Sequence, residues 1–160
     1  MSDEKLFTES EANRFFAIQY HNKTWDLLDQ KERTQDEDER MQDYAHASLA
    51  HWRTAGSAVH HQRGEWVLAR VYTVLGMADQ ALKHAERCYG LLQSHAAEME
   101  DFDFAFAFEA LARAYAAAGN RQKAQEWRQQ AKQAGGRIQD AEDRDIFLAE
   151  FNRDGWFGIE

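Results

Sequence analysis

Seven histidines are the side chains in this sequence best suited to bind a metal ion. Two metal ligands on one helix need a separation of three or four residues, so that both side chains lie on one face. His46 and His51 are five residues apart, and neither a His-Glu-x-x-His nor a Glu-x-x-His motif is present. We therefore expect hydrogen-bonded or surface histidines, and we predict no metal and no other cofactor.

The cysteine content and the catalytic motifs of the sequence indicate whether an enzyme is expected. Cys88 lies among the apolar positions Ala85, Leu91 and Leu92, which predicts a core residue. The sequence contains no Gly-rich phosphate loop, no nucleophile elbow and no recognisable catalytic triad. The residues therefore favour a binding protein over an enzyme and leave an enzymatic role open.

The composition indicates which elements must position these side chains. Proline is absent, the helix formers Ala, Gln, Glu, Leu and Arg are abundant, and Val and Ile are scarce. A chain of 160 residues is long enough to bury the core of one domain. We predict an all-α protein in which residues 1–160 form a single domain, a compact stack of about seven helices.

Charge and hydropathy limit the classes of partner. The formal net charge of −9 repels phosphate backbones and acidic lipids, so nucleic acid is not an expected partner. No apolar run approaches the roughly 20 residues that cross a bilayer, so no membrane association is expected either. One cysteine and a polar start without a secretory signal predict a cytoplasmic protein.

Caps and glycines divide the sequence into seven expected helices. Their approximate ranges are 10–30, 35–55, 64–75, 78–97, 101–118, 121–134 and 140–152. The clearest start is at Thr34, which forms a capping box with Glu37. Phenylalanines at every second position from Phe102 to Phe108 imitate a strand, but the same stretch continues as a helix to Ala118, which predicts a buried central helix. The aromatic residues expected to be largely buried are Trp25, Trp52, Tyr72, Phe104, Phe108 and Tyr115.

An internal repeat is the strongest signal in the sequence. Leu68-Ala69, Tyr72, Gly76 and Ala81 recur with identical spacing as Leu111-Ala112, Tyr115, Gly119 and Ala124. These residues and spacings resemble tetratricopeptide repeats, in two units at about 62–95 and 105–138. The copies lie 43 residues apart (from Leu68 to Leu111), against about 34 in that family, so extra turns are expected in the fourth helix or its connection. Ser48, Trp52 and Gly56 echo the same spacing as half a repeat.

The resemblance implies antiparallel helix pairs whose first helices line a concave, peptide-binding surface. In that register the groove positions are His46, Trp66, Arg70, Glu109 and Arg113. Two arginines one repeat apart can hold a carboxylate or phosphate, with Trp66 as a stacking wall. The alternative is that Glu109 pairs with Arg113 and with Arg70, and only neutralises buried charge.

Two functions follow from these positions. The first is a protein- or peptide-binding scaffold or adaptor of unknown partner, which can also form a homo-oligomer. The second is the binding or conversion of a small anionic metabolite in a pocket of His46, Trp66, Arg70 and Glu109. An open groove favours the first function, whereas a closed pocket with buried His46 and Glu109 favours the second.

The C-terminal tail, residues 153–160, is expected to dock on a helical surface. Trp156 and Phe157 form an aromatic pair, and such exposed pairs mark contacts. Ile159 and Glu160 offer an apolar side chain beside a free carboxylate, which suits a groove with two arginines. We expect the tail to pack on its own helices or on a second copy, giving a homodimer if the exchange is mutual. The alternative is that Trp156 caps the seventh helix against the first.

Overall fold

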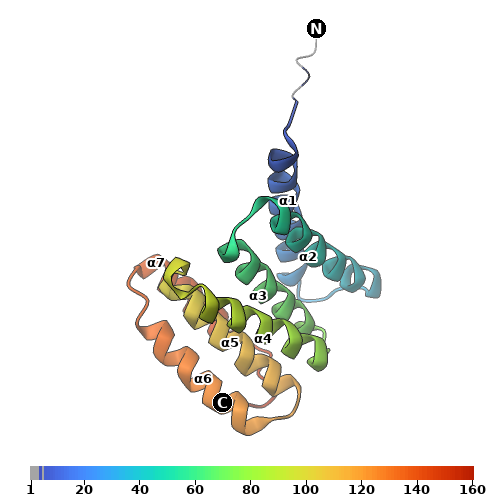
Figure 1. Cartoon of the computed structure of the whole chain (residues 1–160). Coiled ribbons are helices and arrows are strands. Elements are labelled where there is room, and N and C mark those ends of the chain that lie inside the picture. The colour runs from blue at the N-terminus through green and yellow to red at the C-terminus, as the bar shows by residue number, and fades with distance from the viewer. Residues whose placement is uncertain (1–3, 5) are drawn as a thin grey trace.

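The computed structural model describes residue 4 and residues 6–160, so most of the polar start, residues 1–3 and 5, lies outside the described part. Within it the chain forms seven α-helices, one short 3-10 turn and no strand (Figure 1). The elements are α1 (Glu9–Leu28), α2 (Gln35–Ala55), α3 (Ala58–Val74), α4 (Ala78–Ser94), η1 (Ala96–Glu98), α5 (Asp101–Ala117), α6 (Arg121–Gly136) and α7 (Ala141–Phe151). This architecture confirms the all-α prediction.

Consecutive helices pack as adjacent pairs, α1 with α2, α3 with α4 and α5 with α6 (Figure 1). From Ala58 to Asp101 the starts of α3 and α5 differ by 43 residues, and the starts of α4 and α6 differ by the same amount. Gly76 and Gly119, with φ of 71° and 78°, close the two pairs in the left-handed conformation that glycine adopts without strain. The α3–α4 and α5–α6 pairs therefore match in spacing and in closing turn.

Side-chain caps set several helix starts. Thr34 accepts a hydrogen bond from the backbone N–H of Glu37, whose carboxylate accepts one in return, as predicted. The third helix starts at Ala58, so the predicted start at Gly64 is wrong. Gly64 lies inside α3 at a point where α2 approaches closely. A Cβ at this position would lie 2.7 Å from a methyl carbon of Leu49, which explains why the residue is glycine. The connection between α4 and α5, where extra residues were expected, contains the short turn η1, and α4 itself ends earlier than predicted, at Ser94.

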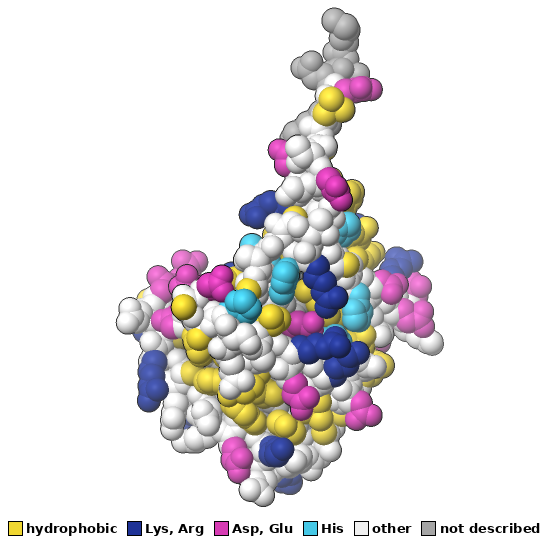
Figure 2. All heavy atoms as spheres, in the orientation of Figure 1, with side chains coloured by type: hydrophobic (Ala, Val, Ile, Leu, Met, Phe, Trp, Pro, Cys, Tyr) yellow, Lys and Arg dark blue, Asp and Glu magenta, His cyan; other side chains and the backbone are white. Residues whose placement is uncertain are grey.

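The first pair differs from the half repeat that the sequence suggested. α2 packs most extensively against α1, and the Ser48 hydroxyl donates to the carbonyl of Ala17 at 2.7 Å. α2 is therefore the second helix of a pair, not the first. The start of α1 stands out from the body of the molecule in the space-filling view (Figure 2).

The core is built from small and aliphatic side chains more than from aromatic rings. The buried alanines of α5 are Ala105, Ala107, Ala110, Ala112, Ala114 and Ala116. Helices that meet through alanine lie close together, and the large rings are left at the edges of the contact. Tyr72 is buried as predicted, but Trp25, Trp52, Phe104, Phe108 and Tyr115 are only half-buried.

The C-terminal helix and tail cover the last pair. α7 packs against α5 and α6, and the buried Phe147 ring fills the space over Gly135. Ile159 packs against Ala116 and Ala124 of the same chain. The tail thus docks on its own helices, which was one of the expected outcomes.

Two details of the tail differ from expectation. The indole N–H of Trp156 donates to the Phe151 carbonyl at 2.9 Å, so this side chain does cap α7. The Trp156 ring packs against Arg113 of α5 and Arg128 of α6, whereas a contact with α1 was expected. Glu160 is exposed, and Arg113 binds backbone carbonyls in place of that carboxylate. Among the described residues, no helix combines the length and the apolar character that a membrane-spanning segment needs.

Candidate functional site

Four of the five predicted site residues lie along the contact between α3 and α5. Trp66 and Arg70 project from α3, and Glu109 and Arg113 project from α5. One carboxylate oxygen of Glu109 accepts a hydrogen bond from Arg113 Nε at 2.5 Å and lies 3.8 Å from Arg70 Nη1. These are the two ion pairs expected if Glu109 only neutralises the buried charge of Arg113 and Arg70.

His46 does not join this group. Its Nε2 lies 2.7 Å from the Tyr72 hydroxyl, and its ring centroid lies 5.7 Å from that of His84. Tyr72 and Arg70 are two residues apart on α3, which places their side chains about 200° apart around the helix. His46 therefore lies on the opposite side of α3 from Arg70, so the predicted pocket of His46, Trp66, Arg70 and Glu109 is not assembled.

Arg113 caps the end of α7. Its Nη2 donates to the carbonyls of Glu150 and Arg153 at 2.8 and 3.2 Å, and its Nη1 donates to the carbonyl of Asp154 at 3.0 Å. The last carbonyls of a helix have no partners within the helix, so a buried guanidinium is a suitable donor for them. Burial lowers the pKa of Arg113, while the Glu109 carboxylate opposes that shift.

Arg70 is held in a similar way. Its Nη2 lies 3.3 Å from a carboxylate oxygen of Glu150, whose other oxygen binds Arg153 at 2.8 Å. Arg70 and Glu109 are both buried. Both arginines proposed to hold an anion therefore already have internal partners, and ligand binding by them stays a prediction.

A cleft of about 380 Å³ opens where α1, α3, α5 and α7 meet. The rings of Trp25 and Trp66 stack there with centroids 5.7 Å apart, and Phe106 meets Trp66 edge to face at 5.1 Å. Ile146 of α7 forms part of the wall and is 53% exposed. Of the predicted site residues, Trp66 alone lines this cleft.

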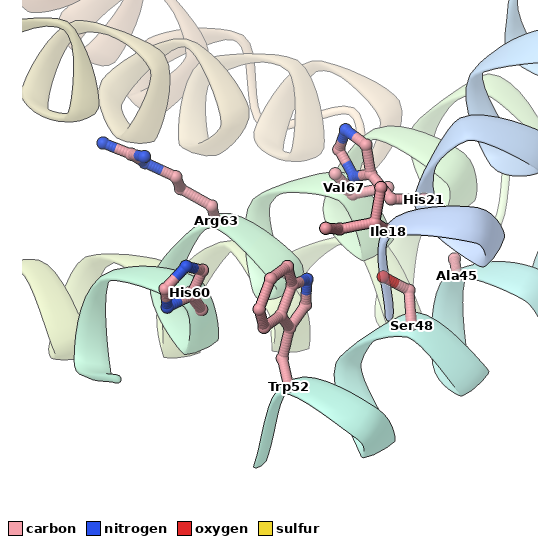
Figure 3. A pocket seen from close by; sticks show the side chains of 9 residues that line it. Ile18, His21, Ala45, Ser48, Trp52, His60, Arg63 and Val67 are labelled. Atoms are coloured by element: carbon pink, nitrogen blue, oxygen red, sulfur yellow. The ribbon is translucent and has the colours of Figure 1, made fainter. Parts of the chain in front are cut away.

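A second cavity of about 200 Å³ lies between α1, α2 and α3. Figure 3 shows Trp52 of α2 between His60 on one side and Ile18 and His21 on the other. The Trp52 and His60 rings stack with centroids 4.1 Å apart. His21 and two α3 side chains, Arg63 and Val67, line both spaces, which therefore lie next to each other. We call the combined feature the aromatic groove, lined by His21, Trp25, Trp52, His60, Trp66, Phe106 and Ile146.

Positive charge surrounds the Trp52 end of the aromatic groove. The Arg14 guanidinium lies 5.5 Å from the Trp52 ring centroid. Arg63 also lines this end, and its side chain is 42% exposed. The pKa of His60 is lowered first by burial and then by Arg14, Arg63 and His61. The field that disfavours a further proton on His60 is a field that attracts an anion.

The carboxylates of the groove are already bound within the molecule. Asp103, 2% exposed, accepts hydrogen bonds from Nε and Nη2 of Arg63 at 2.9 and 3.0 Å and from the Glu100 N–H at 3.0 Å. Glu150 is bound by Arg70 and Arg153. The charged groups at the groove that keep free capacity are therefore arginine donors, while Gln62 Oε1 of the larger cleft is a neutral acceptor without a hydrogen-bond partner among the described residues.

Cys88 is a buried free thiol. Burial raises the pKa of the Cys88 thiol, which opposes its use as a nucleophile. No group of three or more His, Cys, Asp or Glu side chains in residues 4 and 6–160 is placed to hold a metal ion. Comparison with known proteins assigns neither a family nor a function, because no family model, curated protein or solved structure matches the chain.

The aromatic groove was not predicted from the sequence, because the repeat register covered α2, α3 and α5 and left out α1 and α7. The signal on α1 was a stripe of Arg14, Ile18, His21 and Trp25, whose spacing of three and four places them on one helix face. Trp25 of this stripe was expected to be a largely buried core residue. A half-exposed aromatic stripe beside two arginines was the feature that could have located the groove.

Proposed function

We propose that this protein is a protein- or peptide-binding scaffold of the helical-repeat type, and that an apolar segment of its partner lies in the aromatic groove. The observation that carries the proposal is the pair of adjacent aromatic-lined cavities, of about 380 and 200 Å³. Ligand clefts in proteins are commonly of this size and largely apolar. The proposed occupant is therefore a segment with two apolar anchor side chains.

The matching α3–α4 and α5–α6 pairs support the resemblance to tetratricopeptide repeats. In that family the first helices of the pairs line the binding surface, and the larger cavity lies on the first helices α1, α3 and α5, with α7 beside them. A helix or strand that crosses these elements presents anchors at intervals of a few residues. The proposal thus joins the expected surface to an observed cavity.

The alternative, an anionic metabolite held by His46, Trp66, Arg70 and Glu109, has less support. Arg70 is paired with two carboxylates, and His46 lies across α3 from it. A metabolite would have to displace these internal pairs, and each would leave a buried charge uncompensated. Nothing in this geometry favours an enzymatic role.

The test is a selection of peptides from a random library of about 12 residues displayed on phage, with the full chain as bait. Selected peptides are then synthesised and titrated while tryptophan fluorescence is followed. Trp25, Trp52 and Trp66 line the groove, so binding there should change the emission. We expect dissociation constants of about 10 μM or tighter.

Two exposed apolar residues of α7 give a matched pair of variants. Ile146 lines the groove and is 53% exposed, whereas Leu148, 40% exposed, is not among its lining residues. Ile146→Glu should weaken peptide binding about tenfold or more, because it places a charge in an apolar site. Leu148→Glu should leave it unchanged. Equal effects of the two substitutions, or a selection that yields no binding peptide, would contradict the proposal.

A further inference from the structure

We infer that the partner segment is acidic where it meets Trp52: one of its apolar side chains fills the cavity beside Trp52, and a neighbouring carboxylate lies against Arg14 and Arg63. This inference rests on the proposed function and adds the charge of the partner to it. It concerns the cavity of Figure 3 and the two arginines beside it.

The cavity has the size of one large apolar side chain. Its volume is about 200 Å³, and an apolar cavity of about 150 Å³ in a protein can hold a benzene ring. Ile18 and Val67 supply aliphatic walls, and the stacked rings of Trp52 and His60 supply an aromatic wall. A leucine or phenylalanine of the partner therefore fits this space.

Arg14 and Arg63 keep donor capacity near the cavity: Arg14 lies beside the Trp52 ring, and the Arg63 guanidinium points away from Trp52 toward Asp103 of α5 (Figure 3). Within residues 4 and 6–160, Arg14 is exposed and forms no ion pair with a carboxylate, and its guanidinium stays near the Trp52 ring. Arg63 uses Nε and Nη2 on Asp103. Its Nη1 has no hydrogen-bond partner in the same part of the chain, and the side chain is 42% exposed. An incoming carboxylate can thus gain charge-assisted hydrogen bonds without breaking the Arg63–Asp103 pair.

The acids at the groove do not offer matching sites for a basic partner. Asp103 is buried with both oxygens bonded, and Glu150 is shared by two arginines. A lysine of a partner would meet Arg14 and Arg63 without a free counter-charge. Screening limits long-range repulsion from the formal charge of −9 to about 8 Å at physiological salt, so the local cations decide the preference.

The experiment uses the same displayed random peptides and the full chain. We expect selected peptides to be enriched in Asp or Glu next to Leu, Phe or Trp. The best binder is then made in two further forms, with its acids replaced by Gln or by Lys. The Gln form should bind about tenfold more weakly than the parent, the Lys form more weakly still, and the difference should shrink as sodium chloride is raised.

Arg14→Glu should remove the preference for the acidic form, because it reverses the charge beside Trp52. The control is Arg87→Glu, since Arg87 is an exposed arginine of α4 that lines neither cavity. Selected peptides without acids, or a preference that survives Arg14→Glu, would overturn the inference. The proposed function would remain intact if Ile146→Glu still weakens binding about tenfold or more. A free chain that sediments as a dimer, and becomes a monomer with Arg14→Glu, would overturn it by naming a second copy as the occupant. Failure of every peptide to bind would instead count against the proposed function.

Discussion

Arg113 and Trp156 lie face to face, with the guanidinium carbon 4.1 Å from the centroid of the indole ring. The same guanidinium donates to Glu109 and to four backbone carbonyls at the end of α7 and just after it. One buried cation therefore joins α5, α7 and the tail. Since Ile146 of α7 forms a wall of the aromatic groove, this contact also holds part of the candidate site in place.

Arg113→Ala should strongly destabilise the fold. The substitution leaves Glu109 buried without its closest counter-charge and removes a charged donor from the carbonyls at the end of α7. We expect the free energy of unfolding to fall by about 3 to 5 kcal/mol, the usual cost of breaking a buried pair. Urea denaturation at pH 7, followed by circular dichroism, measures it. Arg137→Ala, at an exposed arginine after α6, should change the same quantity by less than about 0.5 kcal/mol. If both variants unfold like the parent, Arg113 does not hold the C-terminal segment.

Gly135 and Gly136 are neighbouring residues of α6 that should respond in opposite ways to alanine. A Cβ at Gly135 would overlap the ring of Phe147, whereas a Cβ at Gly136 has no atom within 4 Å. Gly135→Ala should therefore cost about 1 to 3 kcal/mol through overpacking. Gly136→Ala should be neutral or stabilise by up to about 1 kcal/mol, because alanine is the better helix former. Thermal unfolding of the two variants makes the comparison. A stabilising Gly135→Ala would show that α7 does not pack as described.

Mild acid should destabilise the protein through the partly buried imidazole of His21. Burial lowers the pKa of His21 below its ordinary value of 6.5, so the folded state favours the neutral ring. Below about pH 7 the unfolded chain then binds more protons than the folded chain, and the free energy of unfolding decreases as the pH falls. Urea denaturation at pH 7.0 and at about 5.5 measures this slope above the range where carboxylates titrate. His21→Gln should make the slope smaller. An unchanged slope in that variant would show that His21 does not contribute.

Local signals explain why the helices could be predicted from the sequence. The Thr34 capping box and the glycines Gly76 and Gly119 act within a few residues of themselves, so their effect is visible in the sequence. Gly64 carries no such local meaning. It was interpreted as a helix boundary, but its role is to admit the Leu49 side chain of another helix.

The candidate site could be predicted only in part, because it depends on contacts between helices. Glu109 and Arg113 are four residues apart on one helix, so their pairing follows from spacing. The stacking of Trp25 on Trp66 joins α1 to α3, and no local pattern specifies it. His46 shows the opposite error: α2 was taken as a first helix of a pair, and the register then placed this residue on the wrong side of α3.

The tail should stabilise the α5–α6 pair of its own chain. Ile159 is 3% exposed and packs against Ala116 and Ala124, whereas Phe157 of the same tail is 48% exposed. Ile159→Ala should lower the free energy of unfolding by about 2 kcal/mol or more, since it removes buried apolar contacts. Phe157→Ala should change it by less than about 0.5 kcal/mol. Sedimentation at micromolar concentration separates internal docking from exchange with a second copy. Docking within one chain requires the same association state for the parent and both variants. A dimer that dissociates when Ile159 is replaced would show that the tail docks on a second copy. The mutual exchange of tails would then be the contact that stabilises the protein.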